Sequence, residues 1–123
     1  MLDKDLLDLA IKFHGHKCSA MPLGLRAGLA AMKKLCVERA SNKELFCLFE
    51  GGPSHAQMCF ADGVQVATGC TLGKENIERL NYGKLAIMLI DVKNKKAVRV
   101  AVRPDFQKKG FKFKVCSDEE RRY

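Results

Sequence analysis

The chain has 123 residues, the size of one ordinary domain, and its 47% hydrophobic content is enough to form a core without a disulfide scaffold. The formal net charge is +8, but there is no tryptophan and no nucleic-acid-binding motif, so we interpret the basic residues as a solvated face and expect no nucleic-acid partner. No apolar run approaches the roughly 20 residues of a membrane span, and the N-terminus lacks a secretory layout. We therefore expect a cytoplasmic protein with no membrane contact and with reduced cysteines.

The first part of the chain is predicted to form two helices separated by a short loop. Apolar residues lie on one face of the first helix at offsets of four, three and four: Leu2, Leu6, Leu9 and Phe13. Asp3 lies near its start, and Gly15 is expected to end it. The second helix is expected to begin at Pro22, whose missing N–H costs nothing in a first turn. Its apolar stripe comprises Leu25, Leu29, Met32 and Cys36.

Small residues at and before the second helix carry two further predictions. Gly24 and Gly28 lie one turn apart, which predicts close approach of another backbone. Cys18 precedes the helix, where backbone N–H groups and the positive end of the helix dipole favour a thiolate.

Cys36 and Cys47 lie in apolar segments and are expected to be small buried residues.

The middle of the chain is predicted to contain a buried strand and a third helix. The apolar run Leu45–Phe49 has strand length and lacks alternation, so both of its faces should be covered. Ser54 and Gln57 form a capping-box pattern that opens the helix, which should end near Thr68-Gly69. Cys59 and Asp62 lie three residues apart and therefore share a face of that helix.

The last third is predicted to form strands. A continuous apolar run within 84–92 predicts a central strand, and 91–95 predicts a hairpin turn into an alternating strand with Val98, Val100 and Val102. Phe111, Phe113 and Val115 alternate with lysines, which is typical of an edge strand. The predicted fold class is α+β, with three helices packed on a mainly antiparallel β-sheet in a single domain over 1–116 and a charged tail over 117–123.

The densest chemistry lies in His14-Gly15-His16-Lys17-Cys18, where two of the three histidines and a cysteine fall within five residues. Imidazole and thiolate are ligands that zinc prefers, and nickel or iron also accept them. On one continuous helix Cys59 and Cys70 would lie about 16 Å apart, too far to share an ion. The economical ligand set is therefore His16, Cys18 and Cys59.

Other residues near this set are candidates for further roles. His14 is an adjacent candidate ligand, and Asp62 is a candidate to orient a histidine, to bind the metal or to transfer a proton. This set leaves a coordination position open, as in catalytic zinc sites. A metal-free nucleophilic pair of Cys18 and His16 is the alternative. His55 we interpret as structural or surface.

Two motifs also carry a family resemblance. The first is His14-Gly15-His16-Lys17-Cys18 followed by Gly24-Leu25-Arg26-Ala27-Gly28; the second runs through Cys59-Phe60-Ala61-Asp62-Gly63-Val64-Gln65, Thr68-Gly69-Cys70-Thr71-Leu72-Gly73-Lys74 and Tyr82-Gly83-Lys84. In this order they resemble the E-subunit family of molybdenum and tungsten formylmethanofuran dehydrogenase, found in methanogens and in anaerobic bacteria. One departure is Ser19-Ala20, which stands where the family usually has Pro-Gly.

The resemblance implies an α+β core domain that forms homodimers and carries a metal-binding active site, here without the C-terminal zinc finger that some members add. His16, Cys18, Cys59, Asp62 and Cys70 match its motif positions, which adds Cys70 to Asp62 as a candidate catalytic residue. Three functions follow as hypotheses: a metalloenzyme acting on a small anionic substrate, an accessory protein that handles metal for subunits of a molybdenum or tungsten enzyme, and a subunit with a structural metal.

Overall fold

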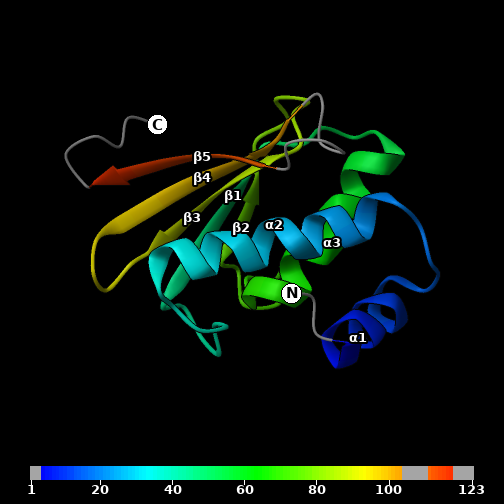
Figure 1. Cartoon of the computed structure of the whole chain (residues 1–123), viewed down its shortest axis with the longest axis horizontal. Coiled ribbons are helices and arrows are strands. Elements are labelled where there is room, and N and C mark those ends of the chain that lie inside the picture. Colours follow the sequence, from blue (N-terminus) through cyan, green and yellow to red (C-terminus); the bar gives the residue numbers. More distant parts are fainter. Residues whose placement is uncertain (1–3, 104–110, 118–123) are drawn as a thin grey trace.

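The structure is a computed structural model that describes residues 4–103 and 111–117. Within these residues the chain forms three helices and one five-stranded sheet (Figure 1). In chain order the elements are α1 (Lys4–His14), α2 (Ala20–Leu35), β1 (Leu45–Phe49), α3 (His55–Thr68), β2 (Ile77–Arg79), β3 (Ala86–Asp91), β4 (Lys96–Val102) and β5 (Phe111–Ser117). Leu2 and Asp3 of the first predicted helix and residues 118–123 of the predicted tail lie outside the described residues.

The sheet has the strand order β2-β1-β3-β4-β5. Adjacent strands of the sheet run antiparallel, except for β1 and β2, which are parallel. The prediction of a mainly antiparallel sheet is therefore confirmed. Leu89 of β3 lies opposite Cys47 on one side and Val98 on the other, which confirms that this apolar strand is central. β5 lies at the predicted edge.

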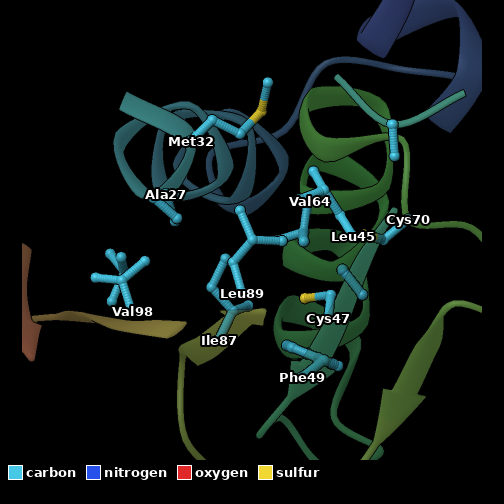
Figure 2. Packing of buried hydrophobic residues seen from close by; sticks show 14 of the residues in the cluster. Ala27, Met32, Leu45, Cys47, Phe49, Val64, Cys70, Ile87, Leu89 and Val98 are labelled. Carbon is cyan, nitrogen blue, oxygen red and sulfur yellow. The ribbon is translucent and has the colours of Figure 1, made fainter. Parts of the chain in front are cut away.

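The main core lies between the sheet and the helices α2 and α3. Figure 2 shows Ala27 and Met32 of α2 and Val64 of α3 beside Leu89 of the sheet. Helix α1 packs against α2 and α3 (Figure 1). A smaller core cluster fills the space among the three helices, and it includes Cys59 with Cys18 packed against it. None of the described helices is both long enough and apolar enough to span a membrane.

Glycines set the contact between α2 and α3, as the sequence predicts. A Cβ on Gly24 would overlap the carbonyl oxygen of Phe60, and one on Gly63 would overlap that of Met21. A Cβ on Gly28 would lie 2.7 Å from the Cβ of Ala67. The two helices therefore approach through backbone, and this close approach holds Cys18, at the start of α2, near α3.

Two burial predictions are wrong. On α1, Leu9 is 51% exposed and Phe13 is 54% exposed. The helix instead packs through a neighbouring face, with Ala10 fully buried and Leu6, Leu7 and Ile11 partly buried. Cys36 is exposed because it ends α2 in a left-handed conformation, with φ of 58°, outside the predicted apolar stripe. Cys47 is fully buried, as predicted.

The parallel strand β2 is absent from the sequence prediction. It has three residues, Ile-Glu-Arg, of which the charged pair is exposed, so it offers neither an apolar run nor a full alternation. Its place in the sheet comes from tertiary contacts: Cys47 pairs with Ile77, and the backbone N–H of Cys47 donates to the carbonyl of Asn76 at 2.9 Å.

Candidate metal centre

The loop after α1 brings three candidate ligands together. Gly15, with φ of +106°, follows the last helical residue and donates its N–H to the carbonyl of Ile11 at 2.8 Å. This left-handed turn suits glycine and reverses the chain. As a result, one donor atom each from His14, His16 and Cys18 lies within 4.8 Å of the others. The rings of His14 and His16 have centroids 4.7 Å apart.

A carboxylate from α3 orients the first of these histidines. Nδ1 of His14 lies 2.7 Å from Oδ2 of Asp62, and Nε2 of the same ring lies 3.6 Å from Sγ of Cys18. The hydrogen bond to Asp62 raises the pKa of His14 above 6.5, against the opposing effect of burial. A carboxylate on one ring nitrogen fixes the tautomer, so the other nitrogen is left to act as an acceptor or ligand.

Cys18 has the environment of a thiolate. Its sulfur accepts the backbone N–H of Met21 at 3.4 Å, in the first turn of α2. Burial raises the pKa of the Cys18 thiol, but the N–H groups of Met21 and Ala20, the thiol of Cys59 and the charge of His14 lower it by more. The net effect is a lowered pKa, in agreement with the expected influence of a helix N-terminus.

Cys59, on α3, lies in the core cluster against which Cys18 packs. It is 3% exposed, and burial followed by its contact with Cys18 raises the pKa of its thiol. Of the two neighbouring thiols, Cys18 is the one whose sulfur accepts a backbone N–H from the first turn of α2, which favours its thiolate. The α3 helix that carries Cys59 starts at Ser54, whose hydroxyl accepts the N–H of Gln57 at 3.3 Å, as the capping pattern predicts. The Gln57 side chain binds Gly52 and Gly83 instead of completing a capping box.

His55 is the residue that sequence reasoning missed. Its Nε2 lies 3.6 Å from Sγ of Cys59, one helical turn further along α3. The signal that could have found it is a repeated spacing, because His55 and Cys59 are four residues apart, as are His14 and Cys18.

Cys70, a candidate catalytic residue by resemblance, lies in a different part of the molecule. It belongs to the larger core cluster with Cys47, whereas Cys18 and Cys59 belong to the cluster among the helices. It is fully buried, and this burial raises the pKa of its thiol to about 11. Among the described residues, the group of converging metal-ligating side chains comprises His14, His16 and Cys18, whereas Cys59, His55 and Cys70 lie outside this group.

Comparison with known proteins assigns the chain to a family. The family profile described as "FmdE, Molybdenum formylmethanofuran dehydrogenase operon" matches residues 13–123. The chain belongs to the FmdE family. This match includes both halves of the candidate centre, the loop from His14 to Cys18 and the helix with Cys59 and Asp62. The expected relation to the E subunit of formylmethanofuran dehydrogenase is thus confirmed.

Two relatives show how far this FmdE chain resembles known proteins. A "Probable S-adenosyl-L-methionine-binding protein" of Archaeoglobus fulgidus is 39% identical over 110 residues. The match covers 86% of the chain but only 29% of that longer protein. A crystal structure of a tungsten formylmethanofuran dehydrogenase E-subunit (FmdE)-like protein from Syntrophus aciditrophicus superimposes with a TM-score of 0.69 at 18% identity, covering 93% of this chain and 71% of that one. At this identity the likeness shows the fold alone.

Proposed function

We propose that this FmdE protein binds a transition-metal ion, with zinc as the default, through His14, His16, Cys18 and Cys59. The observation that carries the proposal is the convergence of donor atoms from His14, His16 and Cys18 within 4.8 Å, on a loop whose geometry depends on Gly15. Ligands of a tetrahedral zinc lie within about 4 Å of one another, so small side-chain rotations suffice to gather them.

The donor set itself favours such an ion. Imidazole nitrogen and thiolate sulfur suit zinc, and nickel or iron are accepted by the same ligand types. The protein supplies what these ligands need: Asp62 holds His14 in the tautomer that presents Nε2, and the start of α2 stabilises the Cys18 thiolate. Reduced thiols are required, which is consistent with the cytoplasm as the proposed location.

A catalytic use of the site is part of the proposal. A zinc ion held by three of these residues would have an open coordination position and would act as a Lewis acid on a small anionic substrate. Asp62 would then orient His14 and exchange a proton with it, because its Oδ2 is in hydrogen-bond contact with Nδ1. Cys70 has no place in this scheme, since it is buried in the other core cluster with a pKa of about 11.

The exposure of His16 supports a second candidate function. A site with an exposed ligand at the molecular surface exchanges metal with a partner more readily than a buried one. Together with the FmdE family, this favours an accessory role, in which a homodimer passes metal to the subunits of a molybdenum or tungsten enzyme. Co-purification with such subunits, and metal transfer to them, would support this role over catalysis.

The experiment that tests metal binding is elemental analysis of anaerobically purified protein. Wild type should contain about one zinc, nickel or iron per chain, whereas His16→Ala, Cys18→Ser and Cys59→Ser should lose it while circular dichroism shows that they fold. Cys36→Ser is the matched control, because Cys36 is an exposed cysteine at the end of α2, outside the ligand group. A wild-type protein that is metal-free and refuses added zinc would leave a thiol–imidazole pair of Cys18 and His14 as the function of the cluster.

A further inference from the structure

We propose that His55 is a further ligand of this metal site and that α3 delivers it together with Cys59. The inference rests on the proposed metal binding but goes beyond it, because His55 precedes the second family motif and was assigned no role from the sequence. With His55 included, the metal centre consists of two histidine–cysteine pairs with the same spacing, in addition to His16.

The two pairs have the same spacing and the same geometry. His14 and Cys18 are four residues apart, with Nε2 and Sγ separated by 3.6 Å. His55 and Cys59 are also four residues apart, and their Nε2 and Sγ are again separated by 3.6 Å. Two ligands with bonds of about 2.0 Å and 2.3 Å to one tetrahedral zinc lie roughly 3.6 Å apart. Each pair therefore already has the separation that a shared ion requires.

The pairs lie next to each other at their cysteines. Cys18 packs against the core cluster that contains Cys59, and each cysteine affects the pKa of the other. The four donors thus follow one another from His14 through Cys18 and Cys59 to His55. Both cysteines are held by the helix-lined core cluster, so the sulfur atoms form the fixed centre of the series.

The place of His55 in α3 explains how its ring reaches the sulfur. It is the first residue of the helix, directly after the Ser54 cap, so its backbone is fixed while its side chain is exposed. Residues four apart on a helix are neighbours on one face, and the ring of His55 lies along this face against Cys59. Because the backbone of His55 is held in the helix and its imidazole is exposed, the ring can turn toward an ion that Cys59 binds.

A site with five candidate donors differs from the open site expected from the sequence. His16 and His55 are both exposed, so each can enter the coordination sphere from the surface, and zinc can expand from four to five ligands.

The test compares zinc affinity in wild type, His55→Ala, His55→Gln and Ser54→Ala, by competition with a chromophoric chelator under anaerobic conditions. We expect both His55 variants to bind zinc about 10–100-fold more weakly, an effect at least as large as that of outer-sphere partners. Ser54→Ala is the matched control: it removes the helix cap next to His55 but no donor, and it should bind zinc as wild type does. Because His55 is exposed, both of its variants should fold.

Cobalt(II) substitution gives a second readout that a merely structural role would not change. The visible bands of the cobalt protein should shift and weaken in His55→Ala, and X-ray absorption at the zinc edge should show fewer imidazole ligands. If wild type binds metal and the His55 variants match it in affinity and spectra, the role of His55 is overturned while the proposed function stands. If wild type binds neither zinc nor cobalt, the proposed function itself fails, and the inference falls with it.

Discussion

Nδ1 of His14 lies 2.7 Å from Oδ2 of Asp62, so a carboxylate in the middle of α3 orients an imidazole at the end of α1. Asp62→Asn keeps the size of the side chain but removes its charge and its preference for accepting a proton. We expect zinc affinity to fall by about 10–100-fold, as is usual when the outer partner of a histidine ligand is lost. Competition titration measures the change, and an affinity equal to that of wild type would contradict the role of Asp62 in supporting His14 as a ligand.

The same pair predicts a pH dependence in the metal-free protein. The folded-state pKa of His14 is raised above 6.5, chiefly by its hydrogen bond to Asp62. A raised histidine pKa stabilises the fold fully below the unfolded value of about 6.5, and this stabilisation is lost as pH rises through the folded value. Urea unfolding should therefore show a larger difference between wild type and Asp62→Asn at about pH 5.5 than in alkaline solution. In a His14→Gln background the Asp62→Asn effect should lose this pH dependence.

Thiol reactivity should follow the different environments of the cysteines. Cys18 has a lowered pKa and Cys36 is exposed, whereas Cys47 and Cys70 are buried with raised pKa values. In native metal-free protein, iodoacetamide should label Cys18 and Cys36, and it should reach Cys47 and Cys70 only after unfolding.

Added zinc should then protect Cys18 while labelling of Cys36 continues unchanged. Peptide mass spectrometry measures each site, and Cys36 serves as the internal control within the same molecule. If zinc protects neither cysteine, or both equally, Cys18 does not bind it.

The sequence predicted most of the fold because local signals and tertiary packing agree. The cap at Ser54, the turn at Gly15 and the central apolar strand all lie where their patterns indicate. The predictions that failed concern features that tertiary contacts determine and local sequence does not. Cys36 continues an apolar stripe in sequence, but it ends the helix and remains exposed. Strand β2 is held by its parallel partner and has almost no pattern of its own.

The candidate site was predicted in part, for the same reason. A dense motif marks His14, His16 and Cys18 without any knowledge of the fold, and the structure gathers their donor atoms. His55 is an isolated histidine in sequence, and its relation to Cys59 becomes visible only when α3 lies beside the loop. Cys70 belongs to the second family motif in sequence, but it follows the end of α3 at Gly69 and lies in the other core cluster.

The crossing of α2 and α3 predicts large effects of small substitutions. In Gly24→Ala and Gly63→Ala the new methyl group would overlap the carbonyl oxygens of Phe60 and Met21, which are backbone atoms and cannot turn away. Each variant should lower the free energy of unfolding by about 3 kcal/mol, the upper part of the range for overpacked cores. Gly73→Ala is the control, because no atom lies within 4 Å of its Cβ position. Urea denaturation that ranks Gly73→Ala with the other two would contradict the close approach.

An ion pair between the buried Glu50 and the partly exposed Arg99 supports the segment that leads from β1 to α3. Glu50 follows β1 and is 7% exposed, and its carboxylate accepts hydrogen bonds from Nε and Nη2 of Arg99 at 2.7 Å and 2.8 Å. Its backbone carbonyl also accepts the N–H groups of Tyr82 and Lys84 in the loop between β2 and β3, so Glu50 joins this loop to the one that follows β1. Arg99→Met leaves this carboxylate buried without its partner and should cost about 3 kcal/mol of unfolding free energy.

The double variant separates the value of the pair from the cost of an unpaired charge. Replacing both partners, as in Glu50→Gln with Arg99→Met, removes the buried charge and should recover much of the loss, because an isolated buried charge is costlier than an absent pair. Urea denaturation of wild type, both single variants and the double variant gives the coupling energy. Additive losses would mean that the two side chains act independently and that the contact contributes little to holding these loops.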